Sequence, residues 1–461
     1  MKCLPFLFAT AAVLTAALEL PAQGRGRRGG RPGGDAQPPA AAETKPDAAA
    51  ETKPKQYTAI VGGDVYLGTG QRLSGATVLI ADDKIDAVGH NLTLPEGTTV
   101  IDAAGKAVSP GFVAVAGYGM GSGRGAPPFG DSVNPFDPEI KQALAAGITA
   151  FLAGNAGGGN VPSGGNAVIK LAYGDVKGML LKEDSVVGLS VPLSLGDREK
   201  LEELVKKTKE YLVAVADFPK KKAADANAKE PQLPPGAEKI VAVLKGEARL
   251  WIQSGGSGFN PFGGGRRGGG SRGNDVDTIR QAMEVARLFG VGVVLQKPTS
   301  SWLVPGEIAA TGSMVVLSPR DRVPADPADP ENTGSNLASA AILAEAGVPV
   351  AVTCPVGMFG GAGVGTGGIL GQDLNTAHID AAFAVRGGMD NRKALRTLTL
   401  DAARILGVDA RLGSLEPGKD ADVLILSGDP LHYATFVMTA VVNGKVVYEK
   451  GKEPLYRHIA R

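Results

Sequence analysis

Histidine and cysteine, the side chains that most often hold zinc in proteins, are scarce in this sequence. Four histidines and two cysteines occur among 461 residues. Cys3 lies in an apolar N-terminal stretch that is expected to be removed, so Cys354 is the single cysteine of the mature chain and no intrachain disulfide is expected. Four histidines are also a small supply for an enzyme built on imidazole ligands.

An excess of charge of either sign is absent as well. The 48 basic and 47 acidic residues give a formal net charge of +1, which excludes a general attraction to nucleic acid or to anionic membranes. Glycine is abundant, with 66 residues, but it is clustered and not periodic, which excludes a collagen-like chain. The 43% of apolar residues can form a substantial core in one large domain and a smaller one.

The N-terminus is typical of a targeting segment. Residues 1–22 combine the positive Lys2, the apolar stretch Leu4–Leu18 and the small residue Ala22, which predicts a signal peptide. The apolar stretch is short for a spanning helix, so no stable membrane insertion is expected, although a retained anchor is the alternative. We therefore expect an exported protein, periplasmic or extracellular. Residues 23–56 are of low complexity, which predicts a disordered tether.

The folded part is expected to begin near Tyr57 and to consist of three regions. Residues 57–109 and 411–454 contain short strands, the first set predicted as a small antiparallel sheet and the second with an Asn443-Gly444 hairpin turn. Because both sets need a partner sheet, we expect one composite β-sandwich built from both ends of the chain. Between them, residues 110–410 alternate strand-like and helical stretches, which predicts a (β/α)8 barrel. The eight expected barrel strands are 112–116, 149–153, 167–172, 185–191, 249–253, 291–296, 313–317 and 349–353.

Three helices are predicted from capping residues and apolar spacing. Asp137-Pro138-Glu139 is a favourable start for a helix that ends at Gly147. The ranges 197–215 and 275–289 have the spacing of amphipathic helices. No Gly-x-Gly-x-x-Gly motif opens a helix after the first strand, which counts against a dinucleotide-binding fold.

Several segments resemble one known family. They are the long C-terminal stretch from Leu398 to Leu426 with Gly428-Asp-Pro430, the strand Val441–Val447, the lead-in Val100–Val113 and the turn and strand Gly164–Leu171. Together they are similar to the amidohydrolase superfamily, in particular to its exported, imidazolonepropionase-like members. The resemblance implies the barrel with its composite sandwich and a hydrolase acting on carbon–nitrogen, non-peptide bonds. It also implies zinc or another divalent metal as cofactor.

The positions that hold metal in this family carry other side chains here. The resemblance implies His-x-His at the end of the first strand, then a carboxylated lysine, two further histidines and a late aspartate. The corresponding residues are Ala116 and Tyr118, Ser190, Gln253, Lys297, and Cys354 or Pro355. The remaining histidines are His90, His378, His432 and His458, and a single one, His378, is expected near the barrel mouth. We therefore predict no metal, no cofactor and no catalytic residue of the family's type, with the six positions lining a pocket.

Two other features of the mouth leave alternatives open. Gly-rich loops, 117–125, 154–159, 254–273 and 357–368, are expected over the strand ends; they could cradle an anion with backbone N–H groups, or be relaxed loops over an abandoned site. The Arg-Gly tract within 254–273 could bind RNA phosphates, but in an exported, nearly neutral protein a solvated loop or an acidic partner fits better. Cys354 near Lys297 could also form an activated thiol, although no histidine is placed as its base.

The sequence thus predicts an exported amidohydrolase-like protein that has lost its metal site. A non-catalytic role is favoured, either binding a small-molecule ligand or pairing with an active paralogous amidohydrolase, with a homo-oligomer also possible and no nucleic acid as partner. The competing hypothesis is an active amidohydrolase with an atypical or metal-independent site.

Overall fold

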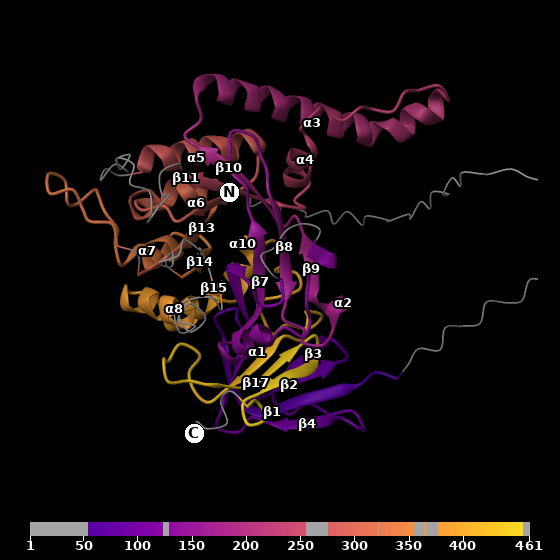
Figure 1. Ribbon diagram of the computed structural model, residues 1–461, viewed down its shortest axis with the longest axis vertical. Coiled ribbons are helices and arrows are strands. Elements are labelled where there is room, and N and C mark those ends of the chain that lie inside the picture. The colour runs from indigo at the N-terminus through magenta and orange to yellow at the C-terminus, as the bar shows by residue number, and fades with distance from the viewer. Residues whose placement is uncertain are drawn as a thin grey trace, which may run out of the picture. The chain divides into compact units, whose positions relative to one another are not determined.

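The computed structural model describes residues 54–122, 129–254, 275–320, 322–354, 364–365 and 377–454. Strands from both ends of the chain form one eight-stranded sheet in the order β18-β17-β16-β5-β1-β2-β3, with β4 paired to β1. In Figure 1 the indigo N-terminal strands and the yellow C-terminal strands lie side by side. The strands are β1 (Tyr57–Tyr66), β2 (Arg72–Ala81), β3 (Lys84–Gly89), β4 (Thr99–Asp102), β5 (Ala107–Pro110), β16 (Val423–Leu426), β17 (Val437–Val442) and β18 (Lys445–Glu449).

This composite sheet is mixed, so the expected antiparallel N-terminal sheet is wrong in part. Strand β1 pairs antiparallel with β2 but parallel with β4 and β5, because the chain returns along the other edge of β1 after the β3 hairpin. Asn443 and Gly444 have φ values of +51° and +71°, as the predicted hairpin turn between β17 and β18 requires. The two ends of the chain meet where β5 pairs antiparallel with β16.

Two five-stranded sheets occupy the middle of the chain. One is parallel throughout and consists of β10 (Val186–Val191), β11 (Arg249–Ser254), β12 (Val294–Gln296), β13 (Met314–Leu317) and β14 (Val350–Val352). The other has the order β15-β6-β7-β8-β9 and consists of β6 (Phe112–Tyr118), β7 (Ile148–Asn155), β8 (Gly165–Lys170), β9 (Leu180–Glu183) and β15 (Val364–Gly365). Each of the eight expected strand segments contains an observed strand.

One of these eight strands, β8, has a direction that differs from the predicted one. Strand β8 was predicted as a barrel strand reached by a helical crossover, but it pairs antiparallel with both β7 and β9. The connection from β7 to β8 spans residues 156–164 and contains no helix, and so short a link joins antiparallel strands only. The prediction of eight interleaved parallel strands is therefore wrong at β8.

Side-chain and backbone groups link the two five-stranded sheets at both of their seams. The Asn166 carboxamide donates to the Val186 carbonyl at 2.7 Å and accepts from the Val186 amide at 3.1 Å, in place of a backbone pair. At the other seam the carbonyls of Thr397 and Leu398 accept from the amides of Val352 and Val113. The connection between α9 (Asn391–Arg396) and α10 (Leu400–Ile405) therefore bridges β14 and β6 through backbone hydrogen bonds.

Several helices begin at residues whose side chains cap them. Asp137 caps the first helix as predicted, its carboxylate accepting from the Glu139 amide at 2.9 Å. The helix expected at 197–215 is longer, because Ser194 caps it and it continues to Ala224. The helices are α1 (Pro138–Ala145), α2 (Val176–Met179), α3 (Leu195–Ala224), α4 (Glu238–Leu244), α5 (Val276–Phe289), α6 (Pro305–Ala310), α7 (Ser339–Glu345), α8 (Ala377–Arg386), α9 (Asn391–Arg396) and α10 (Leu400–Ile405), with 3-10 turns at Phe129–Asp131 and Ser301–Leu303.

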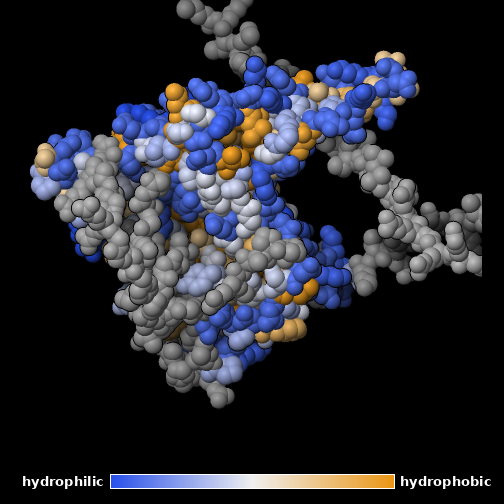
Figure 2. Space-filling view, turned by 45° about the horizontal axis from the view of Figure 1, so that its top comes forward, coloured by the Kyte–Doolittle hydropathy of each residue, from blue (hydrophilic) through white to orange (hydrophobic). Residues whose placement is uncertain are grey.

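Helix α3 is mostly exposed. Of its 30 residues Leu201, Val205 and Thr208 are buried, and Figure 2 shows a mainly hydrophilic surface over this helix at the top of the view. Across the described ranges, every helix is too short or too polar to cross a bilayer.

Two apolar layers sandwich the strands of the parallel sheet. Alternate residues such as Val187 and Leu250 pack outward against α3, α4, α5 and α7. The residues between them, such as Val186, Trp251 and Val294, form an inner cluster with residues of β6, β7 and α10. The alternation fixes which strand-end side chains face the inside.

A buried ion cluster joins the β8 hairpin to the composite sheet. The Lys170 ammonium, 1% exposed, lies 2.8 Å from a carboxylate oxygen of Asp420 and 2.8 Å from one of Asp422. The Asn443 side-chain oxygen also accepts from Lys170, and Arg411 donates two hydrogen bonds to Asp420 at 2.7 and 3.1 Å. We call these five residues the Lys170 cluster.

Candidate functional site

The inward strand ends of the parallel sheet carry neutral polar side chains. Ser190 follows Val186 and Gly188 on one side of β10, and Gln253 follows Trp251 on β11; Val186 and Trp251 belong to the inner cluster. By the same alternation Gln296 faces inward at the end of β12 and Thr353 beyond β14. Hydroxyl and carboxamide groups therefore lie at the inward ends of β10, β11, β12 and β14, and two of them, Ser190 and Gln253, are at positions where the family resemblance implies metal ligands.

A bulge in β6 turns Ala116 and Tyr118 toward the same side. The pairing of β6 with β7 shifts between Ala114 and Gly117, which inserts one extra residue into β6. A second buried apolar cluster, which we call the outer cluster, lies on the other face of β6 and β7 and includes Phe112, Ala114 and Phe151. A β-carbon on Gly117 would lie 2.6 Å from the Phe151 ring, so Gly117 faces this outer cluster. Its neighbours Ala116 and Tyr118 consequently face the inside.

The glycine-rich loop after β7 packs directly onto Ser190 and Gln253. The Gly159 amide donates to the Ser190 hydroxyl at 3.0 Å, and the Ser190 amide donates to the Gly159 carbonyl at 2.8 Å. The Gln253 amide nitrogen donates to the Gly157 carbonyl. Both side chains thus hold residues 156–164, which we call the β7–β8 loop.

Glycines make this close packing possible. A β-carbon on Gly188 would lie 2.4 Å from the Gly157 carbonyl oxygen, and one on Gly158 would lie 2.6 Å from the Gln253 side-chain oxygen. Gly157 also has a φ of +82°, a left-handed conformation that side chains disfavour. The glycines of 154–159 therefore form an ordered contact, whereas most of the Gly-rich ranges 254–273 and 357–368, and part of 117–125, lie outside the described residues.

Lys297 and Cys354 do not face the inside as their neighbours do. Lys297 follows β12 with a φ of +50°, and its ammonium donates to the Cys354 carbonyl at 3.4 Å. The Cys354 side chain is buried in the outer cluster, beside Phe112 and Val364. Pro355 lies outside the described residues. Val294 and Ala351 face the inner cluster, and the residues two positions further along the chain are Gln296 and Thr353. Knowing which strand residues face inward would therefore have identified Gln296 and Thr353 from the sequence.

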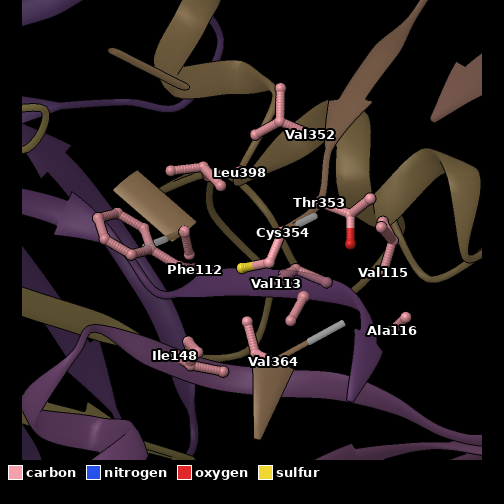
Figure 3. A pocket seen from close by; sticks show the side chains of 12 residues that line it. Phe112, Val113, Val115, Ala116, Ile148, Val352, Thr353, Cys354, Val364 and Leu398 are labelled. Atoms are coloured by element: carbon pink, nitrogen blue, oxygen red, sulfur yellow. The ribbon is translucent and has the colours of Figure 1, made fainter. Parts of the chain in front are cut away.

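A small apolar cavity lies at the seam between β6 and β14. Its volume is about 10 Å³, and Phe112, Cys354 and Leu398 are among the side chains around it in Figure 3. A single water needs about 10–15 Å³ and at least two polar partners, which apolar walls do not supply. This cavity therefore has neither the size nor the chemistry of a substrate site.

The donor set at the strand ends does not fit a divalent metal of the family's type. Zinc sites use thiolate, imidazole and carboxylate ligands, and the inward side chains offer methyl, phenol, hydroxyl and carboxamide groups. Within the ranges that the structure describes, no three histidine, cysteine, aspartate or glutamate side chains are grouped closely enough to hold a metal ion. We therefore derive no reaction step through a metal.

The described histidines do not supply the missing ligands. Burial lowers the pKa of His378 on α8, and its Nε2 has no hydrogen-bond partner among the described residues. His90 is exposed after β3, and the ring of His432 stacks on Tyr433 at 4.9 Å. His458 lies outside the described residues.

Parts of the chain are similar to known proteins. Residues 292–453 match the model of the amidohydrolase family. Two curated proteins of Symbiobacterium thermophilum match over 71 residues each: a 5-methylthioadenosine/S-adenosylhomocysteine deaminase at 34% identity, and an imidazolonepropionase at 39%. These matches cover 12% and 14% of this chain, and 16% and 17% of the relatives, so the chain spans about a sixth of their length.

A solved structure extends the similarity over most of the chain. The crystal structure of an amidohydrolase from Thermotoga maritima superposes with a TM-score of 0.58 at 24% sequence identity. The superposition covers 85% of this chain and 100% of that one. At this level of identity the similarity concerns the fold alone.

Proposed function

We propose that the chain is a metal-free, non-catalytic member of the amidohydrolase superfamily whose fold serves another purpose. One observation carries the proposal. Ser190 and Gln253, at two of the implied ligand positions, are hydrogen-bonded to the backbone of the β7–β8 loop. Because the loop backbone forms hydrogen bonds with these two side chains, Ser190 and Gln253 are not available to bind a metal or a substrate.

We propose that the fold is the barrel with a composite β-sandwich that the family resemblance implies. The two five-stranded sheets, linked through Asn166 and through Thr397 and Leu398, are consistent with a distorted (β/α)8 barrel spanning residues 110–410. Residues 57–109 and 411–454 would then be the composite β-sandwich. Residues 1–22 would direct export to the periplasm or the exterior, and 23–56 would be a tether.

Pairing with an active paralogous amidohydrolase is the role that we favour. A ligand at the inward strand ends would have to displace the β7–β8 loop, together with its hydrogen bonds to Ser190 and Gln253 and its backbone bridge to Gly188. These hydrogen bonds are partly buried, and each contributes about 0.5–1.5 kcal/mol, which weighs against a small-molecule ligand there. Binding of a partner protein at the surface would not require the β7–β8 loop to leave the inward strand ends.

The alternative is an enzyme with a metal-independent site. Cys354 with Lys297 is the candidate pair, but the thiol packs in the outer apolar cluster while the Lys297 ammonium approaches the Cys354 backbone carbonyl. A thiolate nucleophile needs a base or a positive charge at the sulfur. The hydrogen bond from Lys297 to the Cys354 backbone carbonyl does not by itself activate the thiol.

Two measurements test the proposal. Purified full-length protein should hydrolyse no amide, lactam or dipeptide above the buffer rate, with or without added zinc or manganese. Turnover that a chelator abolishes would contradict it. Turnover that a chelator leaves intact and Cys354→Ala removes would support the thiol enzyme instead.

The pairing role has its own test. Affinity capture of the tagged chain from its native source should recover an amidohydrolase that has a His-x-His strand. A clean monomer or homo-oligomer would contradict pairing without restoring catalysis.

A further inference from the structure

A second cavity lies at the opposite end of strand β14 from Thr353 and Cys354. It has a volume of about 180 Å³ and is bounded by Val348 and Val350 at the start of β14, together with side chains of α9 and α10. All of its lining residues are described by the structure. It is separate from the inward strand ends and does not depend on the function proposed above.

Cationic side chains dominate this cavity. Lys393 and Arg396 of α9 and Arg404 of α10 line it, and Asp401 is the single acid among the lining residues. The Asp401 carboxylate accepts from Arg396 at 2.8 Å and from Arg404 at 3.1 Å, through the same oxygen. The three cationic side chains and the one carboxylate give the cavity lining a formal charge of +2.

The Arg396 guanidinium has a donor that Asp401 does not use. Its Nε is buried and has no hydrogen-bond partner among the described residues. A buried donor without a partner costs about 1–3 kcal/mol, and more when it is charged, so such groups are usually satisfied by a bound water or ion. Asp401 accepts from Nη2 and not from Nε, which leaves the Nε donor for a further acceptor.

We propose that this cavity binds a small dianion with phosphate or carboxylate oxygens, held by Arg396, Arg404 and Lys393. The planar forks of two arginines match the paired oxygens of such anions, and the lysine supplies a third charge. The volume is below the roughly 300 Å³ of sites for drug-sized ligands, which fits an ion of a few heavy atoms. Val348 and Val350 form an apolar wall that strengthens the attraction by excluding water.

Calorimetric titration of the full chain with inorganic phosphate and, separately, with succinate at constant ionic strength tests the site. Saturable binding of at least one of the two anions is expected, and the tighter one identifies the chemistry of the ligand. Lys393→Gln is the diagnostic variant, because Lys393 is exposed and its loss should not affect folding. It should weaken binding by roughly three- to tenfold, and Arg404→Gln by roughly tenfold or more.

Arg392→Gln is the matched control, since it removes the same charge one residue away on α9, outside the cavity lining. Its affinity should stay within about twofold of the original, because an exposed charge outside the site is screened. The proposal is overturned if neither anion binds saturably to the unaltered chain. It is also overturned if Arg392→Gln weakens binding as much as Lys393→Gln does.

Discussion

The Lys170 cluster and the inward strand ends both place polar side chains inside the fold, but they hold them in different ways. The Lys170 cluster consists of charged groups that neutralise one another across the junction of β8 and the composite sheet. The strand ends carry Ser190 and Gln253, neutral groups bound to a glycine-rich backbone. Asp420 and Asp422 lie within the C-terminal stretch that resembles the superfamily. The strongest resemblance therefore falls on residues that hold the fold together, which is why it predicts fold better than activity.

The largest effect is expected from removing the ammonium group at the centre of the Lys170 cluster. Lys170→Met leaves Asp420 and Asp422 buried without their shared partner, and breaking a buried pair in this way costs about 3–5 kcal/mol of unfolding free energy. Urea denaturation measures it. The control is Lys445→Met, whose ion pair with Asp175 is exposed and contributes less than about 1 kcal/mol. Similar losses in both variants would show that burial of the cluster is unimportant.

The pH dependence of the unfolding free energy tests the charged groups of the Lys170 cluster, since the neutral side chains Ser190 and Gln253 do not titrate. Burial acts to raise the pKa of Asp420, but the hydrogen bond from Arg411 and the charge of Lys170 prevail and lower it to about 2. A carboxyl with a depressed folded-state pKa stabilises the fold above its unfolded value of 3.8, and this contribution, about 2 kcal/mol, is lost as the pH falls from about 4 to 2.

Asp422 acts in the opposite direction. Burial raises its pKa in spite of the charge of Lys170, so its protonation in the folded state offsets part of the loss at low pH. Denaturation of the unaltered chain and of Asp420→Asn across this range separates the two groups. A variant with the same acid dependence as the unaltered chain would contradict the role of Asp420.

The packing of the β7–β8 loop on β10 can be tested by adding a β-carbon at Gly188. Gly188→Ala places a β-carbon 2.4 Å from the Gly157 carbonyl oxygen, so the β7–β8 loop must move, at about 1–3 kcal/mol. Gly196→Ala is the control, because a β-carbon there meets nothing within 4 Å and lies in the first turn of α3. It should leave stability unchanged or raise it by up to about 1 kcal/mol. If Gly188→Ala is tolerated equally well, the loop does not pack on β10.

The smallest effect is expected from Ser190→Ala. This variant removes one hydrogen bond, to the Gly159 amide, and should lower the unfolding free energy by about 1 kcal/mol. Chemical denaturation and proteolysis within residues 156–164 measure it. No change in either would mean that the Ser190 hydroxyl does not hold the loop.

Sequence patterns identified most elements of the fold because their signals are local. Apolar runs marked the strands, Asp137 and Gly147 marked the two ends of a helix, and Asn443-Gly444 marked a hairpin. The antiparallel course of β8 does not follow from its sequence, because an apolar run has no direction. The parallel pairing of β1 with β4 and β5 depends on long-range contacts that no local pattern carries.

That the residues at the implied ligand positions line a pocket stays a prediction. Alternation along the strands places Ala116, Tyr118, Ser190 and Gln253 on the side of the inner cluster. Gln296 and Thr353, each one residue before Lys297 and Cys354, share that side, since successive residues of a strand point to opposite faces. The glycines of 154–159 were interpreted as an anion cradle or as relaxed loops. Their packing on Ser190 and Gln253 fits neither hypothesis.

The metal content of the purified full-length chain, after expression with added zinc and manganese and dialysis against metal-free buffer, tests the central claim most directly. Elemental mass spectrometry should find far less than one ion per chain, because the inward side chains offer no thiolate, imidazole or carboxylate ligands. One or two tightly held ions per chain, lost on treatment with a chelator, would contradict the account.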